Sequence, residues 1–182
     1  MVNILKLELT NLQQEILRLL FIKVGISLNA RGVAKALGVS QPAVSKALPL
    51  LEKKELIRVE KDKESGRFSI SLNREIGQVI WLKRADNLKQ IYDSGLASFL
   101  RDSFPGCTII LFGSYSNGED VLTSDIDFAV VGRGEKEINL SRFEKILDRK
   151  IILNFYPSFK KVHKSLLENI LNGIILFGGV EL

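Results

Sequence analysis

The chain has 182 residues, of which 46% are hydrophobic and 26% are charged. These values are typical of a soluble globular protein and exclude a disordered tail protein, and the length allows one medium domain or two small ones. With one cysteine and one histidine, no intrachain disulfide and no Cys/His zinc site is expected, and a reducing, cytoplasmic setting is the default. The apolar stretch at 16–26 is interrupted by Arg18 and Lys23 and is too short to cross a bilayer, so no membrane association is expected.

The formal net charge of +5 is unevenly distributed. Residues 1–74 carry 13 Lys and Arg against 7 Asp and Glu, whereas residues 75–182 carry 13 against 14. The basic excess therefore belongs to the first part of the chain. Such an asymmetry is a weak indication of contact with nucleic acid.

The first part of the chain begins with a helical pattern. Apolar residues at i, i+3 and i+4 spacing over 15–22 predict an amphipathic helix. Asn29 stands where an N-cap belongs, before a short helical run that Gly38 ends, and Ser40 is placed to cap the next helix. Two helices joined by a short turn that contains glycine form a helix-turn-helix.

A β-hairpin is predicted after these helices. Residues 56–60 and 67–72 alternate between apolar and polar side chains, and the polar run 61–66 joins them. The order of helix, helix-turn-helix and hairpin, with the run VAKALGVSQPAVSKALPLLEKKELIRVEK, resembles the winged-helix regulators of bacteria and archaea. The resemblance covers about 60 residues.

This resemblance implies contact with DNA. The residues expected in the major groove are Ser40, Gln41, Ser45 and Lys46 of the second helix of the motif, and those expected on phosphates are Lys61, Lys63 and Arg67 of the wing. A homodimer is expected because single winged helices rarely hold DNA tightly alone. Two alternatives stay open: the basic residues form an ordinary solvated surface, or the domain serves dimerisation or protein binding.

The second part of the chain alternates helices and strands. A long helical pattern over 75–101, which Gly95 interrupts, is expected to connect the two parts. The remaining predicted elements are strands at 108–112, 126–130, 150–155 and 173–177 and helices at 140–147 and 159–171. The sequence therefore predicts a small mixed α/β domain after the connecting helix.

The most informative motif lies between the first two of these strands. An apolar strand ends in Gly113-Ser114 and, after ten further residues, a second strand opens with Asp125-Ile126-Asp127. Alternate strand residues share a face, so the two carboxylates lie on one side with Cα atoms about 6.5 Å apart. They repel each other unless a cation lies between them, and such a pair around Mg²⁺ or Mn²⁺ is how phosphoryl-transfer sites neutralise a triphosphate. Gly113 and Ser114 suit the phosphates, because glycine permits close backbone approach and the N–H groups of a following helix favour an anion.

Gly113-Ser114, the spacing and Ser124-Asp125-Ile126-Asp127 resemble the nucleotidyltransferase superfamily of the DNA polymerase β fold, and most closely its minimal nucleotidyltransferase domains. The resemblance covers about 75 residues. It implies that Gly113 and Ser114 hold the phosphates of a nucleoside triphosphate, and that Asp125 and Asp127 are catalytic residues that bind Mg²⁺. A third carboxylate from a later strand is implied as well. Minimal domains of this family are often antitoxins that modify a partner toxin, so a partner protein is one possible acceptor.

Two positions depart from the family's pattern. The third carboxylate is expected at position 152, where this chain has isoleucine. Asn154, two residues further on the same face, is a neutral amide and a weak ligand. Ser116-Asn117 stand where the family commonly has Ala-Arg, so a cation that would face the phosphates is replaced.

The sequence therefore predicts an α+β chain with a winged-helix DNA-binding domain at 1–74, a connecting helix at 75–105 and a minimal nucleotidyltransferase domain at 106–182. Two functions are left open. The first is an enzyme that binds a nucleoside triphosphate with Mg²⁺ and transfers a nucleoside monophosphate to a hydroxyl of a protein or nucleic acid. The second is a transcriptional regulator whose nucleotidyltransferase domain is catalytically degenerate and only binds or senses nucleotide. The Asp125–Asp127 pair favours the first function, and Ile152 favours the second.

Overall fold

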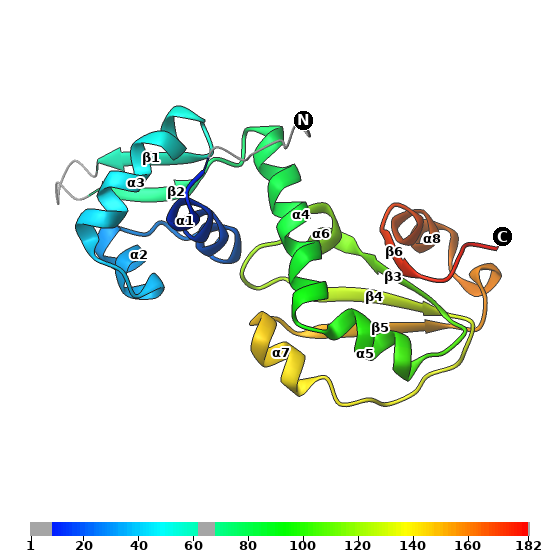
Figure 1. The fold of residues 1–182 in the computed structure, drawn as a ribbon. Coiled ribbons are helices and arrows are strands. Elements are labelled where there is room, and N and C mark those ends of the chain that lie inside the picture. The colour runs from blue at the N-terminus through cyan, green and yellow to red at the C-terminus, as the bar shows by residue number, and fades with distance from the viewer. Residues whose placement is uncertain (1–8, 62–67, 182) are drawn as a thin grey trace, which may run out of the picture. The chain divides into compact units, whose positions relative to one another are not determined.

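The computed structural model describes residues 9–61 and 68–181. The chain divides into two compact units, one ending at Val79 and the other beginning at Ile80, and Figure 1 shows the elements of each. Within the described ranges, no helix is long and apolar enough to cross a membrane.

The first unit contains three helices and a two-stranded antiparallel sheet. Its elements are α1 (Asn11–Ile22), α2 (Ala30–Leu37), α3 (Gln41–Lys53), β1 (Ile57–Lys61) and β2 (Phe68–Leu72). The predicted caps are present: the Asn29 side chain accepts from the Gly32 N–H at 2.8 Å, and the Ser40 side chain accepts from the Ala43 N–H at 3.3 Å. Gly38 ends α2 in the left-handed conformation with φ 67°. The helix-turn-helix and the hairpin of the wing are thereby confirmed.

The core of this unit joins the helices to the hairpin. Ile16, Val33, Val44, Leu51 and Ile70 are fully buried, one or more from each of the three helices and from β2. Within α3, the buried residues Val44, Ala47, Leu48 and Leu51 recur at helical spacing, so their burial is what the periodicity of the sequence requires.

The long helical pattern after the wing forms two helices. These are α4 (Gly77–Asp93) and α5 (Leu96–Ser103). Gly95 lies between them in the left-handed conformation with φ 79°, which glycine adopts at little cost and which ends a right-handed helix.

The second unit is built on a four-stranded mixed sheet in the order β5-β4-β3-β6. The remaining elements are β3 (Thr108–Phe112), α6 (Gly113–Asn117), β4 (Ile126–Val131), α7 (Ser141–Leu147), β5 (Ile151–Tyr156), the 3-10 helix η1 (Phe159–Lys161), α8 (Lys164–Leu171) and β6 (Ile174–Phe177). β3 pairs antiparallel with both β4 and β6, whereas β4 and β5 are parallel. The mixed α/β architecture predicted for this part is confirmed.

Helices cover both faces of this sheet. On one face, Leu111 and Phe128 pack with Leu100 of α5 and Phe143 of α7. On the other face, a second cluster joins residues of β3 and β4 to Ile170 of α8. Figure 1 shows α5 and α7 on one side of the sheet and α8 on the other. The alternation of strand residues between these two cores explains why β3 is a continuous apolar run.

The helix expected over 159–171 is interrupted. η1 ends at Lys161, Val162 is extended, and α8 begins only after His163 as its N-cap. Val162 is buried in the second cluster beside Phe159. The extended residue turns an apolar side chain into the core, so tertiary packing overrides the helical pattern here.

Gly118, at the end of α6, is a position where only glycine fits. It has φ +76°, and a Cβ atom there would lie 2.5 Å from the Ile80 carbonyl oxygen and 2.8 Å from the Arg84 backbone nitrogen, both in α4. Gly106 has nearly the same backbone, with φ +77°, but a Cβ atom there would meet no atom of the described residues within 4 Å. The turn after α6 therefore packs directly on the backbone of α4.

Gly118→Ala is expected to destabilise the protein by about 2–4 kcal/mol, because it adds steric overlap with α4 to the cost of a left-handed alanine. Gly106→Ala, which carries only the backbone cost, is expected to lose about 1–2 kcal/mol. Chemical denaturation of the two variants and the wild type measures the difference. Equal losses would contradict the close packing of Gly118 on α4.

Candidate functional site

A glycine turn and a carboxylate meet at the end of β3. Gly113 begins α6 with φ +75°, and a Cβ atom on it would lie 3.0 Å from Oδ2 of Asp127. The absence of a side chain therefore lets the carboxylate of Asp127 approach the backbone of the turn. This close approach brings together two of the predicted site residues.

Internal hydrogen bonds fix the shape of this turn. The Ser116 hydroxyl donates to the Gly113 carbonyl at 2.8 Å. The Ser114 carbonyl accepts from the N–H groups of Glu119 at 2.9 Å and Asp120 at 3.2 Å. Ser114 itself is partly exposed at the start of α6, on the same turn as Gly113.

Asp127 carries the clearest electrostatic perturbation of the site. It is the second residue of β4, lies opposite Phe112 of β3 and is partly buried. Burial, followed by the negative charge of Asp125, raises the pKa of the Asp127 carboxyl above its ordinary value. Asp125 lies just before the strand and is exposed. The two carboxylates are therefore close enough to repel each other, as their spacing predicts.

The register of the sheet places Ile152 beside Asp127. In the parallel pair of β4 and β5, Asp127 is aligned with Ile152 and Ala129 with Asn154, and neighbouring strands are about 4.8 Å apart. Position 152 therefore lies next to the aspartate, where a third carboxylate would have to stand, and isoleucine supplies no oxygen. Across the described residues, no group of three or more His, Cys, Asp or Glu side chains is arranged to hold a metal ion.

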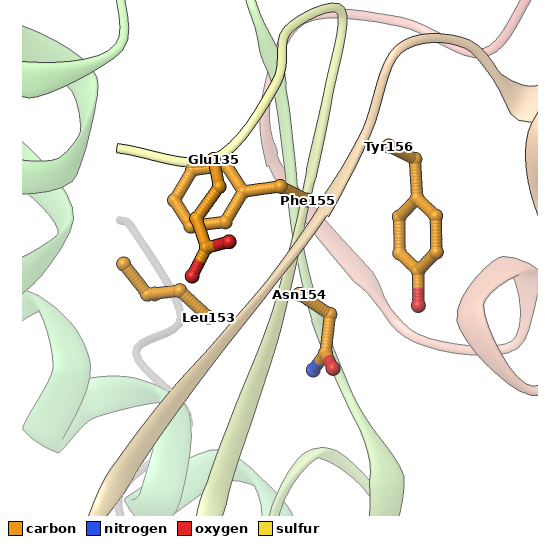
Figure 2. Close-up of a pocket in the computed structure, with 5 residues that line it drawn as sticks. All are labelled: Glu135, Leu153, Asn154, Phe155 and Tyr156. Atoms are coloured by element: carbon orange, nitrogen blue, oxygen red, sulfur yellow. The ribbon is translucent and has the colours of Figure 1, made fainter. Parts of the chain in front are cut away.

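Asn154 lies on the same side of β5 as Ile152, but it lines a hollow that does not include the aspartate pair. Its Nδ2 donates to the Phe128 carbonyl at 3.4 Å. A hollow of about 270 Å³ surrounds the free edge of β5 and is lined by Glu135 and residues 153–156. Figure 2 shows Asn154 and Tyr156 on one side of the strand and Leu153 and Phe155 on the other. Burial raises the pKa of the Tyr156 hydroxyl.

The donor set suits one divalent cation better than two. Asp125 and Asp127 are hard oxygen donors whose mutual repulsion a cation would relieve. With Ile152 in the third position, the remaining ligands of such an ion would be water and phosphate oxygens. Asp125 and Asp127 would hold the ion, and it would neutralise charge on a bound triphosphate.

A buried polar cluster beside the turn was not anticipated from the sequence. Lys83 of α4 and Asp120 form an ion pair in which each side chain is 1% exposed. Nδ2 of Asn87 donates to Oδ1 of Asp120 at 2.7 Å and to the Tyr115 carbonyl at 2.9 Å. A signal for this cluster exists in the periodicity of α4, because positions 79, 83, 87 and 91 form one buried stripe that includes a lysine and an asparagine.

The residues predicted to contact DNA lie on α3 and at the wing of the first unit. Ser40 caps α3, while Gln41, Ser45 and Lys46 are exposed on that helix and Lys61 is exposed at the end of β1. Ser45 also lines an apolar hollow of about 230 Å³ between α3 and the hairpin, with Val59 and Phe68 among its other residues. The remaining two, Lys63 and Arg67, lie outside the described residues.

Two family models match the chain. The model of the MarR family matches residues 10–67, and the model of the nucleotidyltransferase domain matches residues 94–179. The first match covers the helix-turn-helix and β1, and it ends before β2. The second match covers the glycine turn and both aspartates. Among curated proteins, none matches.

Solved structures similar to the chain include several of the regulator MepR from Staphylococcus aureus. MepR itself, described as a transcription regulator of the multidrug efflux pump MepA, is 30% identical over 53% of this chain and 72% of its own, with a TM-score of 0.40. A MepR–DNA complex is 29% identical over 53% of this chain and 82% of its own, with a TM-score of 0.38. A point mutant of MepR from a multidrug-resistant clinical isolate is 33% identical over 37% of this chain, with a TM-score of 0.34, and the match spans half of that mutant's length.

The raised pKa of Asp127 predicts a pH-dependent loss of stability. Its folded-state carboxyl holds the proton more tightly than the unfolded chain does, so this stabilising contribution is complete below about pH 4 and is lost as the pH rises through the folded pKa. Asp127→Asn is therefore expected to raise the unfolding temperature at pH 7, and the difference from wild type should shrink towards pH 4. Thermal unfolding between pH 4 and pH 8 measures it.

Asp102→Asn is the matched control for this measurement. Its side chain is exposed, on α5, and its substitution should leave the pH profile close to that of the wild type. If Asp127→Asn gave the same profile as this control, the electrostatic repulsion assigned to the aspartate pair would be wrong.

Proposed function

Because this chain joins a MarR-family winged-helix domain to a nucleotidyltransferase domain, we propose that it binds DNA through the first and a nucleoside triphosphate with Mg²⁺ or Mn²⁺ through the second. We further propose that the second domain transfers a nucleoside monophosphate to a hydroxyl of a protein or nucleic acid. A partner protein is one candidate acceptor. A homodimer in the cytoplasm is part of this proposal, because two winged helices bind adjacent half-sites on DNA.

The single observation that carries the nucleotide proposal is the approach of Asp127 to Gly113. Its carboxylate lies against a glycine turn that has no side chain to block it. A cation held by Asp125 and Asp127 would therefore stand beside backbone that phosphates can reach. Carboxylates alone would repel a triphosphate, whereas carboxylates with a divalent cation attract it.

The reaction proposed at this site is a substitution at phosphorus. The oxygen of the acceptor hydroxyl forms a bond to the α-phosphorus, the bond from that phosphorus to the oxygen of the β-phosphate breaks, and pyrophosphate leaves with the bonding electrons. The acceptor hydroxyl loses its proton to solvent water in this step. A bound divalent ion would neutralise part of the negative charge of the phosphates. Gly113 and Ser114 would position the phosphates, and Asp125 and Asp127 would hold the ion.

A second candidate function is a regulator that binds or senses nucleotide without transferring it. The observation that favours it is the pairing of Ile152 with Asp127. An isoleucine beside the aspartate pair neither binds a second ion nor accepts the proton of the acceptor hydroxyl. Both candidates require nucleotide binding at the same residues, and they differ only in catalysis.

Incubation of the purified protein with radiolabelled ATP, GTP, CTP or UTP and Mg²⁺ or Mn²⁺, with and without host extract, tests the transfer. A labelled acceptor band is expected for the wild type. It should disappear in Asp125→Asn/Asp127→Asn, because the charge that holds the cation is lost. The same double variant is expected to lose Mg²⁺-dependent nucleotide binding in calorimetry, and unchanged affinity would refute the assignment of these residues.

Ile152→Asp separates the two candidates within this experiment. Nucleotide binding without label in the wild type, together with label in Ile152→Asp, would identify the regulator with a degenerate site. Label in the wild type would identify the enzyme. The variant Ile152→Asn, similar in size but uncharged, is the control for the added negative charge.

If the first domain binds DNA, replacing basic residues of α3 and the wing is expected to reduce the fraction of DNA that the protein retains in a gel shift. Lys46→Ala/Lys61→Ala is expected to weaken retention of host DNA fragments and to lower the slope of log affinity against log salt by about 1, because Lys61 is expected on a phosphate and Lys46 in the major groove. Gel shifts at salt concentrations between about 50 and 200 mM measure this change, because affinity from phosphate contacts falls steeply over that range.

The control for the charge is Lys160→Ala/Lys164→Ala, which removes two exposed lysines of the second unit. It should leave retention and slope unchanged. If the variant of α3 and the wing bound DNA as the wild type does, the first domain would have to be assigned to dimerisation or protein binding instead.

A further inference from the structure

The most strongly buried ionic group of the second unit lies beside the glycine turn. The carboxylate of Asp120 is 1% exposed, as is its partner Lys83. Oδ1 of Asp120 also accepts from Nδ2 of Asn87 at 2.7 Å, and Oδ2 lies 3.9 Å from a guanidinium nitrogen of the buried Arg149. We call these four residues the Asp120 cluster.

The Asp120 cluster joins three segments that surround the proposed nucleotide site. Lys83 and Asn87 belong to α4, and Asp120 belongs to the loop that leads from the glycine turn to the aspartate pair. Arg149 precedes β5, the strand that contains Ile152. No member of the cluster is among the residues assigned to nucleotide or metal.

Contacts with the turn are made both by the cluster and by its surroundings. Nδ2 of Asn87 donates to the Tyr115 carbonyl within α6 at 2.9 Å, and the Asp120 N–H donates to the Ser114 carbonyl. Gly118 lies on the backbone of α4. The turn that would hold the phosphates is therefore fixed to one face of α4 by polar contacts and by packing.

We propose that Lys83, Asn87 and Asp120 are positioning residues of the nucleotide site: they hold the Gly113-Ser114 turn on α4, at the place where it meets Asp127. This inference rests on the proposed nucleotide binding. The cluster acts through the turn and touches no substrate. Without it, the turn and the loop to Asp125 lose their common attachment.

The charges of the Lys83–Asp120 pair can be tested apart from the volume that the two side chains fill. Replacing a buried ion pair with apolar or neutral side chains of similar volume is often neutral for stability, whereas removing one partner leaves a costly unpaired charge. An ion pair with several directed hydrogen bonds does, however, fix the orientation of the groups that it joins. Stability and position can therefore be separated by removing both charges together.

Lys83→Met/Asp120→Asn removes both charges of the ion pair at nearly constant volume, and the guanidinium of Arg149 stays in the cluster. The matched control is Lys89→Met/Asp93→Asn, because Lys89 and Asp93 form an exposed ion pair on the same helix. Both variants are compared with the wild type at a temperature at which circular dichroism shows all three to be folded. The same pair of substitutions thus tests a buried position beside the turn and an exposed position on α4.

Two readouts are measured on each protein. The first is the hydrogen-exchange protection of the Glu119 amide, which donates to the Ser114 carbonyl, with no nucleotide present. The second is the calorimetric affinity for MgATP, MgGTP, MgCTP and MgUTP. Lys83→Met/Asp120→Asn is expected to lose protection and to bind nucleotide about tenfold more weakly or worse, as for supporting residues of a metal site. Lys89→Met/Asp93→Asn should match the wild type in both.

Each other outcome has a defined meaning. If the folded buried-pair variant keeps wild-type affinity, or loses affinity while Glu119 stays protected, the positioning role is wrong. If that variant does not fold, Asn87→Ala carries the same two readouts, and about a threefold loss of affinity or more is expected from one lost hydrogen-bonding group. If the wild type binds none of the four nucleotides, the proposed function fails. Retained protection in the buried-pair variant would then overturn the attachment of the turn as well.

Discussion

The contacts of the buried Asp120 carboxylate are the interaction that links α4, the loop after the glycine turn and the segment before β5. A carboxylate with 1% of its side chain exposed is tolerated only when cations and hydrogen-bond donors replace the water that it has lost. Lys83 and Asn87 supply them from α4, and Arg149 supplies a second cation from the start of β5. Residues of α4, of the loop after the glycine turn and of the segment before β5 therefore meet at Asp120.

The surroundings of Asp127 differ from those of Asp120, because its charged neighbour is a second carboxylate and not a cation. It is partly buried beside a second negative charge, and burial and Asp125 together raise its pKa. One acidic side chain is thus neutralised inside the protein, while a neighbouring pair is left with an unfavourable charge. A pair of this kind lowers the stability of the unliganded protein and favours any ligand that brings positive charge. Asp120 is therefore suited to a structural role, and Asp125 and Asp127 are suited to binding a cation.

The register of the sheet determines which side chains lie beside Asp127 and therefore how many oxygen ligands the site offers. Its register aligns Asp127 with Phe112 on one side and with Ile152 on the other. Two of the three strand positions around the site are therefore apolar, and oxygen donors come from β4 and the residue before it. This is why the proposed binding of a cation and a nucleotide has more support than the proposed transfer, and why one substitution at position 152 distinguishes the two candidate functions.

The sequence by itself determined the local elements and the motif. Caps at Asn29 and Ser40, strand periodicity, and the spacing of Gly113 to Asp127 depend on neighbouring residues, so they are readable along the chain. The break at Val162 and the burial of Lys83 with Asp120 were decided only by the tertiary structure. Lys83 and Asp120 are 37 residues apart, and although the periodicity of α4 places Lys83 on a buried stripe, nothing local identifies Asp120 as its partner. Their burial follows from the folding of α4 onto the turn, because only that packing removes water from both.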